Sequence, residues 1–205
     1  MSQAAKRANV RLARHAERRG IAAALATGIS QAQGEIVASL DADCTYDPRQ
    51  LVRLLALLTD DVDVVVASPY HPEGEAVGVP EWRLALSRLA SRCYRLLMRN
   101  KLHTYTSCVR VYRRRTVAAV PLKHDGFVGV VELLWRVDRR GGTIVECPAT
   151  LTARTTGQSK LRLARTILSH AGFLLSAAWE RTFFSSRNGV NRQSAAQNSL
   201  TPQTP

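Results

Sequence analysis

The chain has 205 residues, of which 45% are hydrophobic, so it can bury the core of one domain and carry an appended tail. Its 29 Lys and Arg residues exceed its 16 Asp and Glu residues and give a formal net charge of +13. This excess favours an anionic partner, such as nucleic acid, an acidic membrane surface or a phosphorylated substrate. The alternative is that the chain is simply a soluble protein from an Arg-rich proteome.

The cysteines and the apolar segments exclude several classes of protein. The four cysteines are irregularly spaced and contain no Cys-x-x-Cys pair, which excludes zinc-ribbon and thioredoxin-like sites. We expect them to be reduced, mostly buried thiols of a cytosolic protein. The first 20 residues are basic and lack an apolar centre, so no secretory signal is expected. The longest apolar stretch, Ala171 to Trp179, is shorter than the roughly 20 residues of a membrane-spanning helix, so any membrane contact would lie along the surface.

Strands and helices alternate over the first third of the chain. Period-two alternation or a short apolar run predicts a strand, a spacing of three or four predicts a helix, and glycines mark turns. The predicted elements are a strand over 9–14, a helix over 21–33, a short apolar strand over 36–40, a helix over 48–58 and a very apolar strand over 62–67. This alternation predicts an α/β fold with a mainly parallel sheet flanked by helices.

Further strands and helices are predicted after residue 67. They are a loop over 68–79, a helix over 80–98, a strand over 107–113, a helix over 127–139, strands over 143–146 and 149–153, and a helix over 159–184. After Ser185 the composition turns to Ser, Asn, Gln, Thr and Pro, which is typical of disorder. We therefore expect one domain over residues 1–184 and a disordered tail over residues 185–205.

Two carboxylates follow the strand over 36–40. Asp41 and Asp43 stand one residue apart where this strand enters a loop, and Asp47 and Pro48 are the expected N-cap and first residue of the next helix. In parallel sheets, ligands bind beyond the carboxyl ends of the strands. An Asp-x-Asp triplet alone is most often solvated, but its place here favours a Mg²⁺ site that also takes the phosphates of a substrate.

A basic segment late in the chain has the composition of a phosphate site. Arg154 and Lys160 flank Gly157 between a predicted strand and a predicted helix. They combine two cations, a flexible loop and the positive end of a helix dipole, although a basic surface loop is the alternative. A second cluster, residues 106–110, offers two hydroxyls and a guanidinium and identifies no site by itself.

Four segments of the chain form a pattern when they are taken together. They are Gly34-Glu35-Ile36-Val37 through Asp41-Ala42-Asp43 to Asp47-Pro48, then Thr106 to Arg114, then Gly126-Phe127 with Glu132-Leu133-Leu134, and finally Arg154-x-x-Gly157-x-Ser159-Lys160-Leu161. In this order they resemble the family 2 glycosyltransferases, and within them the dolichol- or polyprenyl-phosphate mannosyltransferase branch. The resemblance runs from about Asn9 to Leu161, and four motifs in register are more specific than any one of them.

The resemblance implies a GT-A-type, Rossmann-like fold, a nucleotide-diphosphate sugar as donor and a polyprenyl phosphate as acceptor. Asp41 and Asp43 would bind Mg²⁺ or Mn²⁺ together with the donor diphosphate. Arg154 and Lys160 would hold phosphates, so that Asp43, Arg154 and Lys160 form the catalytic group. The remaining substrate-binding residues implied by the resemblance are Ser107, Arg110, Glu132 and Ser159.

The chain departs from the family pattern at its N-terminal end. Family members begin with a strand that bears Pro-x-Tyr-Asn-Glu and a second strand that ends in Asp-Asp-x-Ser, and this chain contains neither segment. We therefore expect a sheet without its first two strands and with an unpaired edge. A misassigned start or fragment, an inactive truncated relative, and a protein completed by a partner chain or a second copy are the alternatives. The family's Ser-Arg-Tyr is Ser68-Pro69-Tyr70 here, and Thr45 replaces a Gln that often follows the acidic triplet.

Three functions compete at this stage. The first is the metal-dependent glycosyltransferase, placed in the cytoplasm and peripherally on the inner face of the cytoplasmic membrane. The helix over 80–98, with Trp82 near one end and an arginine face, is typical of a helix at a membrane interface or of a solvated face. The second is a non-catalytic relative that binds lipid or a partner protein. The third, a nucleic-acid-binding protein, is disfavoured because the charge is spread along the chain without an aromatic stacking platform.

Overall fold

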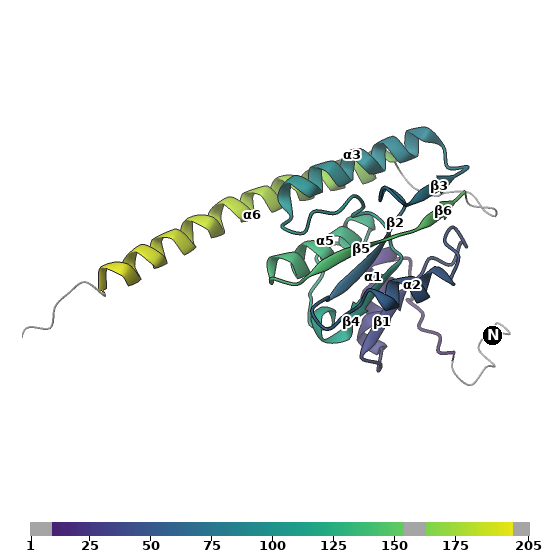
Figure 1. Ribbon diagram of the computed structural model, residues 1–205, viewed down its shortest axis with the longest axis horizontal. Coiled ribbons are helices and arrows are strands. Elements are labelled where there is room, and N and C mark those ends of the chain that lie inside the picture. The colour runs from purple at the N-terminus through teal and green to yellow at the C-terminus, as the bar shows by residue number, and fades with distance from the viewer. Residues whose placement is uncertain (1–9, 154–162, 199–205) are drawn as a thin grey trace, which may run out of the picture. The chain divides into compact units, whose positions relative to one another are not determined.

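The computed structural model describes residues 10–153 and 163–198, and the chain divides into two compact units, Met1–Leu161 and Arg162–Pro205. The helices of the first unit are α1 (Ile21–Gln31), α2 (Gln50–Ala56), α3 (Glu81–Leu97), α4 (Arg114–Val117) and α5 (Phe127–Arg139). Its strands are β1 (Ile36–Ser39), β2 (Val64–Ser68), β3 (Glu75–Val77), β4 (Arg110–Arg113), β5 (Ile144–Pro148) and β6 (Thr150–Thr152). The helix α6 (Leu163–Asn198) is the described part of the second unit (Figure 1).

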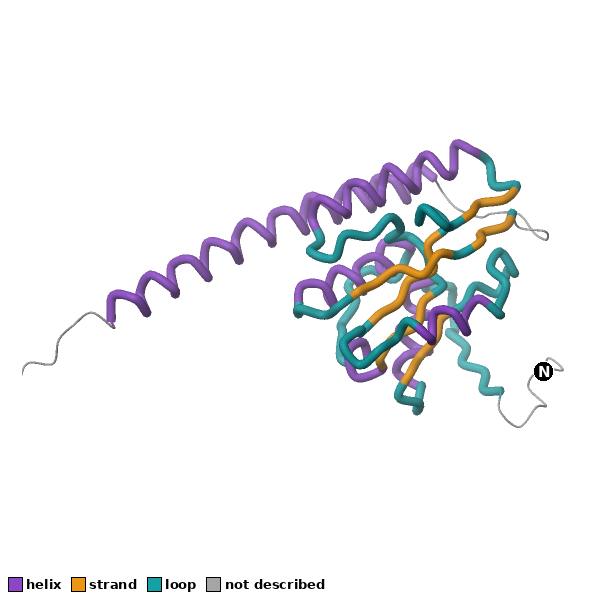
Figure 2. The backbone as a smooth tube through the Cα atoms, in the orientation of Figure 1, coloured by secondary structure: helices purple, strands orange, loops and turns teal. Residues whose placement is uncertain are grey.

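A four-stranded sheet in the order β1-β4-β2-β5 forms the centre of the first unit (Figure 2). β2 and β5 pair in parallel, whereas β4 runs antiparallel to both of its neighbours, β1 and β2. β1, β2 and β5 therefore point the same way, which confirms the α/β class and adds one antiparallel strand to a sheet expected to be mainly parallel. The carboxyl ends of β1 and β2 lie on the same side of the sheet as the amino end of β4. The register shows this, because Ser39 and Val66 both pair with Arg110.

Helices cover both faces of this sheet. On one face, Leu54 of α2 belongs to a buried cluster with Val65 of β2 and Val111 of β4. Alternate residues of a strand point to opposite faces. Arg110 therefore points to the other face, where its guanidinium donates a hydrogen bond to the Val130 carbonyl of α5. α5 covers this second face, and α1 packs against α5.

The start of α1 depends on a carbonyl from the loop before α5. The Asp125 carbonyl accepts hydrogen bonds from the amides of Ala22 (3.0 Å) and Ala23 (3.2 Å), which the first turn of a helix leaves unpaired. Gly20 precedes them with φ 120°, and a Cβ at this position would lie 2.3 Å from the Asp125 oxygen. Glycine is therefore required at this close approach.

β3 and β6 form a separate two-stranded parallel sheet (Figure 2). The other edge of β6 is bonded by the segment that follows β1. The Gln50 side chain donates to the Thr150 carbonyl (3.0 Å) and accepts from the Thr150 amide (2.8 Å). The Thr152 amide donates to the Thr45 carbonyl (2.8 Å). The loop after β1 and the start of α2 therefore continue the small sheet on its second edge.

β1 is an edge strand and is more exposed than the buried strand we expected over 36–40. Ile36 is 45% exposed and Leu40 is 39% exposed. Among the described residues β1 pairs with β4 alone, so its other edge has no strand partner there, as expected. The predicted strand over 9–14 is wrong for its described part, because residues 10–14 are irregular and no neighbouring strand supports them.

The predicted helices are found, with shifts at their ends. α5 has the predicted bounds, whereas α2 begins two residues later than expected because a turn precedes it. The N-cap of α2 is Arg49 and not the expected Asp47, whose carboxylate instead accepts the Arg49 amide (2.8 Å) within the preceding turn. α6 continues to Asn198, past the predicted end near Phe184 and into the segment expected to be a tail. No helix in the described parts of the chain is both long enough and apolar enough to cross a membrane.

Candidate functional site

The acidic loop, residues 41–47, leaves β1 at the edge where the strand ends meet. Asp41 and Asp43 are half-buried. Asp43 Oδ1 accepts hydrogen bonds from the Thr45 amide (3.2 Å) and from the Thr45 hydroxyl (2.8 Å). Cys44 between them has φ 58°, a left-handed conformation that is uncommon outside glycine and that tightens the turn. The loop itself therefore orients the Asp43 carboxylate.

Besides burial, the negative charges of Asp41 and Asp43 both raise the pKa of Cys108, which lies just before β4. Burial raises the pKa of Cys108 to about 12, the negative charges of Asp41 and Asp43 add to the rise, and Arg110 opposes it. Charges shift a pKa in this way only at short range. Asp41 and Asp43 therefore lie near the amino end of β4, as the sheet topology requires.

Tyr46 connects the acidic loop to the segment before β4. Its side chain is buried, and this burial raises the pKa of Tyr46, while a hydrogen bond with the Ser107 side chain opposes the rise. Ser107, a predicted substrate-binding residue, is itself 7% exposed. The structure thus brings Asp41 and Ser107 together near Tyr46, with Asp43 near the neighbouring Cys108. Sequence reasoning missed Tyr46, because a single aromatic residue in a loop carries no signal of its own.

Side chains from α3 and from the connection after β2 border this cluster. The Arg88 guanidinium carbon lies 5.1 Å from the centre of the Tyr70 ring, within the range of a cation–π interaction. The hydroxyls of Ser87 and Thr106 are hydrogen-bonded to each other (2.7 Å), and Ser87 also bonds Tyr70. Arg88 therefore places a guanidinium over the ring of Tyr70, the residue that follows Pro69.

Arg110 lies beneath the site and not on its surface. Its side chain is wholly buried, and its guanidinium donates to the carbonyls of Val130 (2.7 Å) and Tyr105 (2.8 Å). Its Nε has no hydrogen-bond partner within the described part of the chain. Arg110 therefore joins β4 to α5 in the core, which differs from the substrate contact that the resemblance implies.

Glu132 is also a buried group. Its carboxylate accepts hydrogen bonds from the backbone amides of Lys123 and His124 and from the side chains of His124 and Arg136. Burial raises the pKa of Glu132, but these hydrogen bonds outweigh it, and the net shift is downward. The described partners of Glu132 all belong to α5 or to the loop before it. This placement differs from the expected substrate contact, because the carboxylate holds the loop that caps α1.

Three predicted site residues, Arg154, Ser159 and Lys160, lie outside the described residues. β6 ends two residues before Arg154, at Thr152, whose amide and hydroxyl both donate to the Thr45 carbonyl (2.8 and 3.1 Å). β6 therefore reaches the acidic loop just before the basic segment begins. The proximity of the acidic and basic groups stays a prediction, and this anchor supports it.

The oxygen donors of the acidic loop fit a hard divalent cation. Asp41 and Asp43 supply two carboxylates on one short turn, and Thr45 fixes the orientation of the second. No group of three or more His, Cys, Asp or Glu side chains that could hold a metal occurs within residues 10–153 and 163–198. Further ligands would come from substrate phosphates and water, which is the usual arrangement for Mg²⁺, and Mn²⁺ takes the same oxygen ligands.

Comparison with curated proteins gives relatives of one kind. The chain is 33% identical over 129 residues to polyprenol monophosphomannose synthase of Mycolicibacterium smegmatis, which covers 62% of this chain and 49% of the relative. It is 30% identical over 152 residues to undecaprenyl-phosphate mannosyltransferase of Micrococcus luteus, with coverage of 71% and 62%. It is 26% identical over 156 residues to dolichol-phosphate mannosyltransferase of Pyrococcus furiosus, with coverage of 75% and 44%. The chain spans about half the length of the curated relatives it matches.

Solved structures support the fold. Glucosyl-3-phosphoglycerate synthase from Mycobacterium tuberculosis in complex with phosphoglyceric acid gives a TM-score of 0.56 at 19% identity, over 80% of this chain and 56% of that one. The same enzyme with Mn²⁺, UDP-glucose and phosphoglyceric acid gives 0.56 at 21% identity, over 78% and 55%. These likenesses concern the fold alone and confirm the expected GT-A type. The sequence model of the family described as glycosyl transferase family 2 matches residues 2–120, which is more than half of the chain. The chain therefore belongs to this family.

Proposed function

We propose that this chain is the glycosyl-transferring part of a protein that moves a sugar from a nucleotide-diphosphate sugar to a polyprenyl phosphate, with Mg²⁺ or Mn²⁺ on the donor diphosphate. The observation that carries the proposal is the acidic loop at the carboxyl end of β1, where Thr45 orients Asp43 and where Ser107 lies close by. The acceptor class comes from the three mannosyltransferase relatives, all of which are named for a polyprenol-type lipid phosphate.

The chain's own residues have separable tasks in this proposal. Asp41 and Asp43 hold the cation, and a cation bound there stabilises negative charge on the departing nucleoside diphosphate. Arg154 and Lys160 bind phosphate oxygens and direct positive charge at the group that gains electrons. Ser107, together with Ser159, contacts the substrate. A lipid monophosphate has its second pKa at about 6, so it is already a nucleophile at neutral pH and needs no strong general base.

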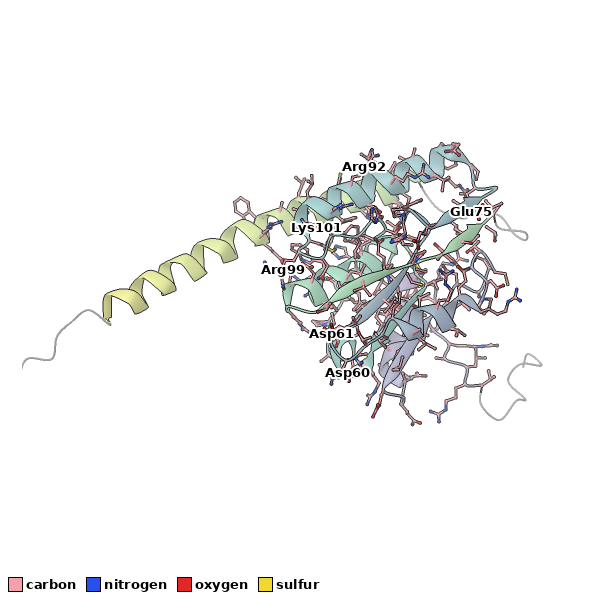
Figure 3. The ribbon with its side chains drawn as sticks, viewed as in Figure 1. Asp60, Asp61, Glu75, Arg92, Arg99 and Lys101 are labelled. Carbon is pink, nitrogen blue, oxygen red and sulfur yellow. The ribbon has the colours of Figure 1, made fainter. Side chains whose placement is uncertain are left out.

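The surface of α3 supports an acceptor taken from a membrane. Three large apolar side chains are exposed at a spacing of seven, which places them in one stripe along the helix: Trp82 (51%), Leu89 (57%) and Leu96 (77%). Exposed arginines accompany this stripe at Arg88, Arg92, Arg95 and Arg99, of which Figure 3 labels Arg92 and Arg99. An apolar stripe with guanidinium groups suits a bilayer that contains anionic lipids. We therefore place the protein peripherally at the inner face of the cytoplasmic membrane.

The test is a transfer assay with the full chain. A panel of nucleotide sugars is incubated with undecaprenyl phosphate and Mn²⁺, and the lipid product is detected by mass spectrometry. The expected result is a glycosyl lipid from at least one donor, abolished by chelation of Mn²⁺ and restored by its return. A chain that binds vesicles but neither binds nor consumes any donor would contradict the proposal and favour a non-catalytic lipid-binding relative.

A further inference from the structure

We propose that β6 positions the acidic loop for binding of a cation–diphosphate, and that Gln50 and Thr152 are the residues through which it acts. The identity of the ligand rests on the proposed function, whereas the contacts do not. Neither residue reaches the cation or the diphosphate in this proposal, so both are positioning residues. Thr152 acts through its hydrogen bonds to Thr45, and Gln50 acts by joining the start of α2 to β6.

Thr45 is hydrogen-bonded on both sides. Its amide and hydroxyl donate to Asp43 Oδ1, at 3.2 and 2.8 Å. Its carbonyl accepts from the amide and the hydroxyl of Thr152, at 2.8 and 3.1 Å. The amide and the carbonyl of Thr45 belong to adjacent peptides joined at its Cα, so a displacement of the carbonyl would also move the residue whose amide and hydroxyl orient the Asp43 carboxylate. Thr152 holds the Thr45 carbonyl, and through this residue it fixes the direction of the proposed metal-binding oxygen.

Gln50 provides the second attachment. Its amide group donates to the Thr150 carbonyl and accepts from the Thr150 amide, at 3.0 and 2.8 Å. This is the exchange of two hydrogen bonds that a paired residue of an antiparallel neighbouring strand would make. Thr150 and Thr152 are two residues apart and so present their backbone groups on the same edge of β6. The acidic loop and the first turn of α2 are thus bonded to the edge of β6 that β3 does not occupy.

The support behind β6 is rigid. β5 precedes it by one residue and pairs along its whole length with β2, whose five residues are all buried. The Ala149 amide, between β5 and β6, donates to the Ser68 carbonyl at the end of β2 (3.1 Å). β6 therefore links the acidic loop to the centre of the sheet, in addition to the loop's attachment to the exposed edge strand β1.

The first test measures binding of Mn²⁺ with inorganic pyrophosphate to the full chain by calorimetry. Thr152→Val removes the hydroxyl donor and keeps the shape, and it should weaken binding about 2- to 10-fold, the equivalent of one ordinary hydrogen bond. Thr152→Ser keeps the donor and should restore the affinity. Thr150→Val is the matched control on the same strand, since the Thr150 hydroxyl makes no hydrogen bond within the described residues, and its affinity should equal that of the unaltered chain.

Gln50→Leu leaves both backbone groups of Thr150 unpaired and should weaken binding about 10-fold or more. Equal affinities in all four variants would overturn the proposal.

The second test separates this inference from the proposed function. Hydrogen exchange of residues 41–49, measured without ligand, should be faster in Gln50→Leu and Thr152→Val than in Thr150→Val, while exchange in β2 stays unchanged. If the unaltered chain binds no Mn²⁺ and pyrophosphate, the metal role proposed above is contradicted, and the exchange measurement alone decides the positioning role. Unchanged exchange in the acidic loop of both variants would overturn it.

Discussion

Two carboxylates in this molecule differ in how deeply they are buried in the fold. Asp43 is half-buried, and its Oδ1 accepts hydrogen bonds from the amide and the hydroxyl of Thr45. Glu132 is 1% exposed, and donors from Lys123, His124 and Arg136 occupy both of its oxygens. The Asp43 carboxylate is therefore partly open to solvent, whereas removal of the Glu132 carboxylate leaves several donors unpaired in the core.

Replacement of Asp43 by Asn should lower sugar transfer to lipid phosphate by about 100-fold or more, because a neutral amide neither holds the cation nor supports charge on the leaving diphosphate. The measurement is initial rate at saturating donor and Mn²⁺. Asp61→Asn is the control, because Asp61 is an exposed acid on the surface of the first unit (Figure 3). Equal rates for Asp43→Asn and Asp61→Asn would remove Asp43 from the reaction.

Replacement of Glu132 by Gln should lower the free energy of unfolding by about 1–3 kcal/mol at neutral pH, because the amide presents hydrogens to groups that are themselves donors. The pKa of Glu132 is lowered on folding, since the hydrogen bonds from His124, Lys123 and Arg136 outweigh the effect of burial. The charged form therefore stabilises the fold above the unfolded pKa of about 4.3, and this stability is lost as pH falls through the folded pKa. Urea unfolding across pH 3–7 should show the difference between the two proteins shrinking toward the acid end. Glu75→Gln on exposed β3 (Figure 3) is the control and should unfold like the unaltered chain at neutral pH.

At the scale of the elements, the capping of α1 by the loop before α5 joins two helices that lie far apart in the sequence. This contact decides where α1 begins, and the only sign of it in the sequence is Gly20. The same helix contains Gly28, an exposed glycine around which an added Cβ would meet nothing within 4 Å. The two glycines therefore predict opposite effects of the same substitution.

Gly20→Ala should destabilise the first unit by about 1–3 kcal/mol, because alanine at φ 120° is strained and its Cβ would meet the Asp125 carbonyl. Gly28→Ala should stabilise it by about 0.5–1 kcal/mol, because alanine loses less backbone freedom than glycine in a helix interior. Chemical unfolding of the two variants beside the unaltered chain gives both values. A stabilised Gly20→Ala variant would show that the close approach at the start of α1 is absent in solution.

The elements that the sequence predicted best are those whose own residues hold the information. α5 has a complete apolar pattern between Gly126 and the Gly141-Gly142 turn, and both of its ends were predicted. The strand over 9–14 failed because alternation alone provides no partner for its backbone groups. In the candidate site, Asp41 and Asp43 could be proposed from their place after a strand, and their metal-binding role stays a prediction. Tyr46, Gln50 and Thr152 were missed, because their roles depend on contacts with residues 61 to 107 positions away in the sequence, which no local pattern encodes. The buried placements of Arg110 and Glu132 were missed for the same reason.

At the scale of the whole molecule, part of the net charge of +13 is concentrated along α3, next to exposed apolar side chains. The arginines stand beside the stripe of Trp82, Leu89 and Leu96, so that charge and apolar surface are offered together to one partner. Electrostatic attraction of this kind weakens as salt shortens the Debye length to about 3 Å at 1 M.

Leu89→Glu should abolish binding of the full chain to vesicles that contain anionic lipid, because it places a carboxylate within the apolar stripe. Binding of the unaltered chain should fall at least tenfold when salt is raised from 0.1 to 1 M and should be weak on vesicles of zwitterionic lipid. Val52→Glu makes the same change at another exposed apolar residue, on α2, and should bind like the unaltered chain. Co-sedimentation measures all three. Retention of binding by Leu89→Glu would exclude this face of α3 as the membrane contact.

The open edge of β1 has a consequence for how the molecule comes apart. β1 is joined to the rest of the sheet through β4 alone within the described residues, whereas β2 is paired on both sides. Strands at a sheet margin detach in partial openings that require far less free energy than complete unfolding. In mild denaturant the chain should therefore lose metal binding at a lower concentration than it loses most of its circular dichroism signal. A strand from another polypeptide that pairs with the open edge of β1 should delay this loss.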